Sequence, residues 1–150
     1  MKIADILAAK GSATHSVGHD RDFRTAVQAM REAGIGSIIV VHSETGMLLG
    51  LISQPEILKG LTTLGASCLR HCVTGIMRRP APSCRPDDDA GTVMRRMTSE
   101  RNRHIVVTLA DAILGVISIG DLVAAQLRQT ALEADVLRDM ARSRLLPAPA

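Results

Sequence analysis

Two stretches of this chain share the pattern of a strand that runs directly into a helix. Residues 114–123 form an apolar, β-branched segment that breaks at Ser118 and leads through a glycine into a helix capped by Asp121. Residues 49–58 repeat this pattern with closely similar residues. The aligned polar positions are Ser53 with Ser118, and Glu56 with Asp121. A junction that occurs twice predicts a duplicated domain.

The chemistry of this junction favours an anion. A helix N-terminus presents unpaired N–H groups and a partial positive charge, which attract groups such as phosphate. In residues 114–123 a hydroxyl, from Ser118, and a carboxylate, from Asp121, flank that terminus. Serine and aspartate also cap helices routinely, at about 1 kcal/mol. Capping and ligand binding are compatible, so both roles stay open for these two residues.

The remaining segments repeat one order of elements, namely strand, helix, strand, strand, helix. Apolar residues at helical spacing predict the helices, and β-branched runs predict the strands. The first set comprises an N-terminal helix over residues 1–10, a strand over 13–17, a helix ending at 33, strands over 37–41 and 47–53, and a helix from 55 to about 65. The second set comprises a connector over 66–79 with a short helix, a strand over 81–84, a helix ending near 100, strands over 104–109 and 112–118, and a helix from 121 to about 140.

The spacing of matched residues supports the duplication. Aligning Met30 with Met97 places Ile38 over Ile105, and the match continues after a turn that is two residues longer in the first repeat. One unit of about 60 residues is marginal alone, so we expect two α/β units to pack their sheets together. The predicted divisions are residues 1–65, a connector over 66–79, residues 80–142 and a flexible tail over 143–150.

Composition excludes several classes of function. The chain has 150 residues, 46% of them hydrophobic, but its aliphatic runs are too short to cross a membrane. Asp5 interrupts what would be the core of a signal peptide, so we expect a cytoplasmic protein. The net charge of +3 is too small to indicate nucleic acid, and Phe23 is the only aromatic residue. A bound base would therefore lie between aliphatic side chains.

The cysteines and polar clusters do not indicate catalysis. Cys68, Cys72 and Cys84 are too few for a disulfide framework and fit a reducing compartment. His71 lies between the first two, which raises a metal site as an alternative, but no second pair of ligands follows, so buried free thiols are expected. No serine has an obvious base partner, and we expect no enzymatic activity and no catalytic cofactor.

The order of elements and the duplicated ending, Gly-hydrophobic-hydrophobic-Ser-x-x-acid, resemble the CBS domain in its tandem form, the Bateman module. The residues that carry the resemblance are Met97, Arg103, residues 104–107 and residues 114–122 in the second repeat, and Ala29, Met30, residues 35–37 and residues 50–53 in the first. The resemblance implies an α/β fold of two β-α-β-β-α repeats packed as a pseudo-twofold pair, with an N-terminal helix and a long C-terminal helix.

The same resemblance implies a regulatory module that senses an adenine nucleotide, such as AMP, ATP, NAD or S-adenosylmethionine, in the cleft between the repeats. Asp121 would hold the ribose, and Ser118 would donate to phosphate. Arg103 and His104 would reach the phosphates, and Ile105, Val116 and the segment from Ala81 to Ser83 would contact adenine. The first repeat offers Ser53 and Glu56 for the equivalent site.

The first repeat departs from the family pattern, so we rank its site below that of the second. Gln54-Pro55-Glu56 follows the serine where many relatives have arginine and aspartate, and Gly36-Ser37 replaces Arg103-His104. The alternative function is a ligand-free module that dimerises or docks on an unidentified protein. A nucleic-acid binder, suggested by the excess of arginine, is a third. By resemblance we expect a homodimer, with the two copies either parallel or antiparallel.

Overall fold

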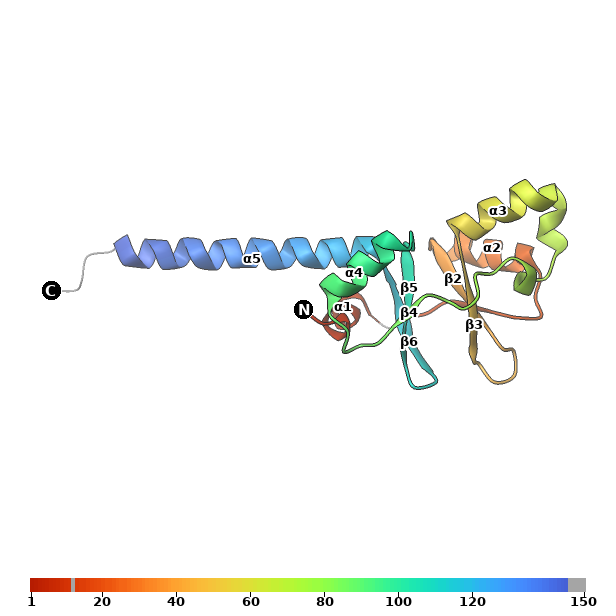
Figure 1. Cartoon of the computed structure of the whole chain (residues 1–150), viewed down its shortest axis with the longest axis horizontal. Coiled ribbons are helices and arrows are strands. Elements are labelled where there is room, and N and C mark those ends of the chain that lie inside the picture. Colours follow the sequence, from red (N-terminus) through yellow and green to blue (C-terminus); the bar gives the residue numbers. More distant parts are fainter. Residues whose placement is uncertain (12, 146–150) are drawn as a thin grey trace.

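Two α/β lobes lie side by side, and a long helix extends away from one of them (Figure 1). The computed structural model describes residues 1–11 and 13–145. Each lobe contains a three-stranded sheet, with the orders β1-β2-β3 and β4-β5-β6. In each sheet the first strand is parallel to the second, and the second is antiparallel to the third. The predicted fold of two repeats packed as a pseudo-twofold pair is confirmed.

The elements follow the predicted order. The first part comprises α1 (Ile3–Lys10), β1 (Ser16–Gly18), α2 (Phe23–Ala33), β2 (Ser37–Val41), β3 (Leu48–Ser53) and α3 (Gln54–Leu64). The second comprises the 3₁₀ segments η1 (Gly65–Arg70) and η2 (Val73–Gly75), then β4 (Ser83–Cys84), α4 (Ala90–Ser99), β5 (His104–Leu109), β6 (Ala112–Ser118) and α5 (Ile119–Leu145).

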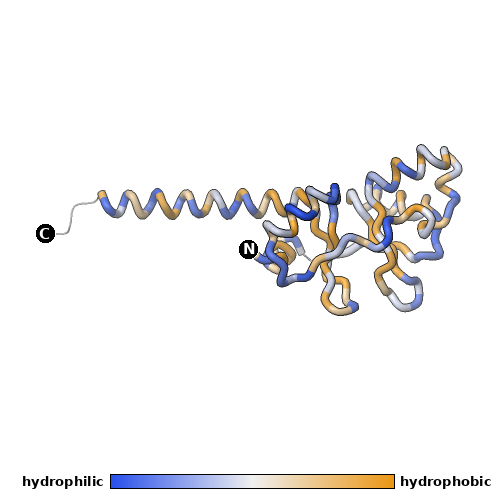
Figure 2. The backbone as a smooth tube through the Cα atoms, in the orientation of Figure 1, coloured by the Kyte–Doolittle hydropathy of each residue, from blue (hydrophilic) through white to orange (hydrophobic). Residues whose placement is uncertain are grey.

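Both faces of each sheet are buried, which explains the continuous apolar runs of the strands. Successive residues of a strand point to opposite faces. In β2, Ile38 packs against helices of its own repeat, whereas Ile39 faces the other repeat. Ile39, Leu51 and Val106 form a buried cluster that joins the two repeats. Figure 2 shows the hydrophobic residues concentrated in the two sheets.

The N-terminal helix packs on the second repeat, although it precedes the first in sequence. Ile3 and Ile6 of α1 belong to the buried core of the second repeat, and the helix lies against β6 and α5. A Cβ added at Gly115 of β6 would meet Leu7 Cδ1 at 2.5 Å. The predicted division at residue 65 places α1 with the first repeat because of its position in the sequence, whereas the helix packs on the second repeat.

The N-terminus of α5 differs from the prediction by two residues. The helix begins at Ile119, so Asp121 lies in its first turn and is not the N-cap. The backbone N–H of Ser118 donates to Asp121 Oδ2 at 2.8 Å, and the backbone N–H of Asp121 donates to Ser118 Oγ at 3.1 Å. This reciprocal arrangement is a capping box, in which Ser118 caps the helix.

Four other expectations need correction. The first strand covers Ser16–Gly18 rather than 13–17, and the connector forms two 3₁₀ segments rather than one short helix. Helix α5 reaches Leu145, so the first part of the predicted tail is helical, and residues 146–150 lie outside the described residues. Cys68 and Cys84 are buried as expected, but Cys72 is exposed. Among the described helices, none combines the length and apolar character needed to span a bilayer.

Candidate functional site between the two repeats

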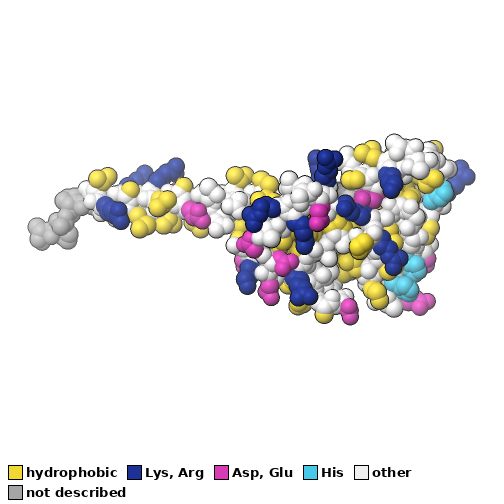
Figure 3. Space-filling model, viewed as in Figure 1, with side chains coloured by type: hydrophobic (Ala, Val, Ile, Leu, Met, Phe, Trp, Pro, Cys, Tyr) yellow, Lys and Arg dark blue, Asp and Glu magenta, His cyan; other side chains and the backbone are white. Residues whose placement is uncertain are grey.

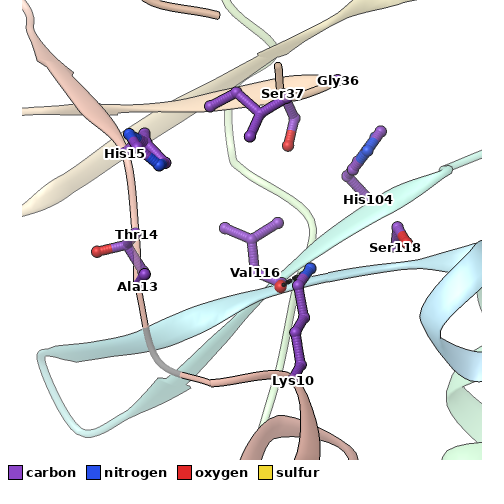
Figure 4. Close-up of a pocket in the computed structure, with 10 residues that line it drawn as sticks. Lys10, Ala13, Thr14, His15, Gly36, Ser37, His104, Val116 and Ser118 are labelled. Atoms are coloured by element: carbon purple, nitrogen blue, oxygen red, sulfur yellow. Dashed lines mark hydrogen bonds between the residues drawn. The ribbon is translucent and has the colours of Figure 1, made fainter. Parts of the chain in front are cut away.

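A cavity of about 290 Å³ lies where the two repeats and the segment after α1 meet (Figure 4). Among the residues that the structure describes, those that line the cavity come from α1, the segment before β1, the start of β2 and the β5–β6 hairpin. The lining residues are Lys10, Ala13, Thr14, His15, Ile35, Gly36, Ser37, His104, Val116 and Ser118. The cavity is therefore built by residues from both repeats and cannot form in either one alone.

Strand alternation aims the polar side chains into this cavity. His104 opens β5 and pairs with Ser118 at the end of β6. His104 shares its face of the sheet with Val106, which packs against the other repeat. Ser37 occupies the matching position at the start of β2. Gly36 allows the ring of His104 to come close, because a Cβ there would lie 3.2 Å from His104 Cε1.

The imidazole of His104 has unused hydrogen-bonding capacity. Its Nδ1 is buried and has no hydrogen-bond partner among the described residues. Burial lowers the pKa of His104 below 6.5, and the positive charge of Lys10 lowers it further, while Asp121 acts in the opposite direction. The ring is therefore neutral at pH 7. An anion beside it would favour the protonated form.

Lys10 ties α1 to the strand-to-helix junction of the second repeat. Its Nζ donates to Asp121 Oδ2 at 2.6 Å and to the carbonyl of Val116 at 2.8 Å. Burial raises the pKa of Asp121, but hydrogen bonds from Lys10 and Ser118 outweigh it, and the net pKa is below 3.8. The carboxylate that the resemblance assigns to ribose is thus occupied by Lys10 in this structure.

The lining suits a small anionic molecule that carries an apolar portion. Lys10, His15 and His104 supply N–H donors. Hydroxyls come from Thr14, Ser37 and Ser118, and aliphatic contact comes from Ala13, Ile35 and Val116. Among the described residues, no group of three or more histidine, cysteine or acidic side chains could hold a metal ion.

Three of the predicted ligand-binding residues line the cavity, namely His104, Val116 and Ser118. Asp121 borders it through Lys10. Arg103 is exposed and lies outside the described lining, because consecutive residues at the start of a strand point in opposite directions. For the same reason Ile105 faces the helices of its own repeat and is 1% exposed.

The other predicted residues lie elsewhere. Ala81 packs in the cluster that joins the repeats. Ser83 is exposed on β4, and its carbonyl accepts a hydrogen bond from Arg96 Nη2 at 2.6 Å. In the first repeat, Ser53 Oγ donates to Glu56 Oε2 at 2.7 Å. Glu56 lines a separate cavity of about 230 Å³ beside η2.

Sequence reasoning missed the part of the lining that comes from α1, the segment before β1 and the start of β2. The missed residues are Lys10, Ala13, Thr14, His15, Ile35, Gly36 and Ser37. Nothing local in residues 10–15 marks them as part of a site in the second repeat. The alignment of Gly36-Ser37 with Arg103-His104 was the available signal, since aligned positions in a pseudo-twofold pair lie at equivalent places.

Comparisons with known proteins agree with this architecture. The CBS-domain model matches twice, at residues 13–62 and 73–128. The chain is similar to the mitochondrial CBS domain-containing protein CBSX3 of Arabidopsis thaliana, with 28% identity over 130 residues. That match covers 82% of this chain and 63% of the Arabidopsis protein, so the chain spans less than two thirds of this relative.

Solved structures of CBS-domain proteins superpose on most of the chain. The CBS-domain protein ATU1752 of Agrobacterium tumefaciens matches with a TM-score of 0.79 and 29% identity, over 83% of this chain and 92% of that one. PAE2072 of Pyrobaculum aerophilum, whose structure is a complex with AMP, matches with a TM-score of 0.70 and 18% identity, over 81% and 89%. With both repeats matched by the family model, the chain belongs to the CBS-domain family as a tandem pair of CBS domains.

Proposed function

We propose that this chain is a regulatory module that binds an adenine nucleotide in the cavity between its two CBS domains. The observation that carries the proposal is the cavity itself, where N–H donors from Lys10, His15 and His104 converge beside aliphatic side chains. In this arrangement a phosphate accepts hydrogen bonds from the N–H donors, and a base packs against the aliphatic side chains. The AMP complex of the distantly related PAE2072 supports this class of ligand.

The size of the cavity favours a mononucleotide. Its volume of about 290 Å³ is just below the range of typical ligand cavities, which run from about 300 to 1,000 Å³. A dinucleotide such as NAD has a second nucleoside that would extend beyond this volume. We therefore rank the mononucleotides above NAD, and AMP before ATP because AMP is the smaller of the two.

Asp121 holds the ribose only after Lys10 releases it. Lys10 Nζ is 2.6 Å from the carboxylate, on a side chain 38% exposed, so it is free to turn toward a bound phosphate. That exchange replaces a link between α1 and α5 with a link through the ligand. If the ligand binds one arrangement of the two repeats more tightly than another, it shifts the population toward that arrangement by the difference in binding free energy. That shift is the basis of a regulatory signal.

Isothermal titration calorimetry with AMP, ATP, NAD and S-adenosylmethionine tests the proposal. We expect AMP to bind the wild type, and His104→Gln to weaken that binding about tenfold, as expected for loss of a hydrogen bond to a charged group. The matched control is His71→Gln, because His71 is an exposed histidine of the connector that lies outside the cavity lining. Absence of binding by all four ligands at millimolar concentration would refute the proposal.

A ligand-free module that dimerises or docks on another protein is the second candidate, favoured by the exposed apolar residues of α5. In that case Ser118→Ala and Asp121→Ala change only the stability of the helix N-terminus, and no ligand raises the melting temperature. Under the nucleotide proposal, AMP at 100 times its dissociation constant stabilises the fold by about 2.7 kcal/mol. A melting scan with and without AMP separates the two candidates.

A further inference from the structure

Two histidines from different segments stack on each other beside the turn between β2 and β3. His19 follows β1 and His42 follows β2, and their ring centroids lie 4.5 Å apart with an angle of 21° between the ring planes. Both side chains are partly buried. Figure 3 shows histidine atoms beside acidic atoms on the surface of the first lobe. Ser37, which lines the cavity between the repeats, begins β2, so the stack lies at the other end of this strand.

Each ring accepts hydrogen bonds from backbone N–H groups of the turn. His19 Nδ1 accepts from the N–H of Ser43 at 3.0 Å. His42 Nδ1 accepts from the N–H groups of Glu44 and Thr45, each at 3.3 Å. A backbone N–H can only donate, so neither Nδ1 atom carries a proton in this arrangement. The contacts therefore require both rings to be neutral, with the proton on Nε2.

The turn packs closely on the segment that follows β1. A Cβ added at Gly18 would lie 2.5 Å from Ser43 Oγ and 2.8 Å from Asp20 Oδ1, so this approach depends on glycine. Ser43 Oγ donates to Asp20, and that hydrogen bond holds the pKa of the carboxyl group below 3.8. Asp20 therefore stays charged at the pH values at which histidine gains or loses a proton. Among these contacts, the one made by the ring of His19 is the one that changes near neutral pH.

The titratable and charged groups around the stack come from three segments. Asp20 and Arg21 follow His19, and Glu44 lies in the turn. The connector contributes Cys72, whose Sγ donates to the carbonyl of His19 at 3.0 Å, and the exposed His71 before it. A proton taken up at Nδ1 turns an acceptor into a donor. Whatever charges lie nearby, that donor then faces another donor, the backbone N–H of the turn.

We propose that the stacked histidines form a pH-sensitive contact, which holds the β2–β3 turn against the segment after β1 only while both rings are neutral. A proton on His19 removes the hydrogen bond from Ser43, and a proton on His42 removes the hydrogen bonds from the next two residues of the turn. Protons on both rings also place two positive charges on stacked rings with centroids 4.5 Å apart. The turn is therefore released as the pH falls, independently of any nucleotide.

Nuclear magnetic resonance of the full chain tests this contact between about pH 8 and pH 5.5, the range in which histidine ordinarily titrates. A long-range ¹H–¹⁵N spectrum of the imidazole nitrogens should place the proton of both rings on Nε2 at the upper pH. As the rings gain a second proton, the amide signals of Ser43, Glu44 and Thr45 should shift with the midpoints of the ring signals. Solvent exchange of these amides, relative to intrinsic rates, should rise about fivefold, as expected for loss of one hydrogen bond.

Asparagine variants separate the two rings, because the asparagine Oδ1 can accept a hydrogen bond in place of Nδ1 but does not titrate. His19→Asn should abolish the pH dependence of the Ser43 amide alone. His42→Asn should abolish that of the next two amides and leave Ser43 titrating. The matched control is His71→Asn, since His71 is exposed in the connector, and all three amides should titrate as in the wild type.

Three outcomes would overturn the proposal. These are a proton on Nδ1 of either ring at the upper pH, turn amides that do not change over the titration, and amide titrations that persist in the matching asparagine variants. The first two are measured on the wild type, so they test the contact even where a variant fails to fold. Circular dichroism of each variant shows whether the fold is retained.

Discussion

Replacing Gly50 by alanine should destabilise the protein, because this position of β3 touches the connector that enters the second repeat. A Cβ at Gly50 would lie 2.8 Å from the carbonyl oxygen of Arg78 and 2.6 Å from Met77 Sδ. The backbone of Arg78 is fixed there by two hydrogen bonds with Leu51, at 2.8 and 3.1 Å. The methyl group therefore meets backbone that is held in place as well as a movable side chain.

The expected cost follows from that distance. Ordinary van der Waals contact begins at 3.4 Å, so the carbonyl of Arg78 must retreat by about 0.6 Å, which strains both hydrogen bonds to Leu51. Overpacking of this kind costs about 1–3 kcal/mol. At roughly 2–4 °C per kcal/mol for a chain of this size, Gly50→Ala should melt about 2–12 °C below the wild type.

Thermal unfolding followed by circular dichroism measures this effect against two controls. Gly115→Ala should cost less, although its Cβ would meet Leu7 Cδ1 at 2.5 Å, because that atom is the end of a flexible side chain. A Cβ added at Gly75 would meet no atom within 4 Å, so Gly75→Ala should melt at or slightly above the wild-type temperature. If Gly50→Ala melts with Gly75→Ala, the proposed contact between β3 and the connector is wrong.

Three further predictions concern single side chains. Because burial holds the pKa of His104 below 6.5, the unfolded chain takes up this proton at a higher pH than the folded chain, and stability should decline as pH falls below about 6.5. The melting temperature of His104→Gln should depend less on pH in this window. Equal pH dependence of the melting temperature in wild type and variant would contradict the assignment. Asp121→Ala should lower the free energy of unfolding, measured in urea, by about 1 kcal/mol through loss of the capping box. Lys10→Met should lower it by less than about 1 kcal/mol, because the ion pair between Lys10 and Asp121 is partly exposed. A larger loss for Lys10→Met than for Asp121→Ala would contradict the roles assigned to the two residues. Thiol labelling of the native protein at pH 8, followed by mass spectrometry, should modify Cys72, which is exposed, and spare Cys84. Cys84 is spared because burial raises its pKa to about 11. Rapid labelling of Cys84 would be inconsistent with its buried position.

The duplicated fold could be predicted because both of its signals are local. β-branched runs such as residues 104–109 and glycine-bounded turns mark the strands, and capping residues mark the helices. In the structure, the carboxylates of Asp22 and Asp89 accept hydrogen bonds from backbone N–H groups in the first turns of α2 and α4, each at 2.9 Å. The same motif in two places then indicates the pairing of repeats without any knowledge of contacts.

The composition of the cavity was harder to predict because it depends on the direction of side chains and on contacts distant in sequence. Arg103 and His104 formed one basic pair in the sequence, but only His104 faces the other repeat. Lys10 is more than 100 residues from Asp121 and reaches it because α1 packs on the second repeat. No local sequence pattern indicates that α1 packs on the second repeat.

Nuclear magnetic resonance mapping of the AMP site tests the central claim most directly. In a ¹H–¹⁵N correlation spectrum of the labelled full chain, saturating AMP should shift the amides of Thr14, Gly36, Ser37 and Val116, which surround the cavity between the repeats. The amides of Thr92 and Val93, which line a separate cavity at the start of α4, should stay unchanged. An unchanged spectrum, or shifts confined to Thr92 and Val93, would contradict the account.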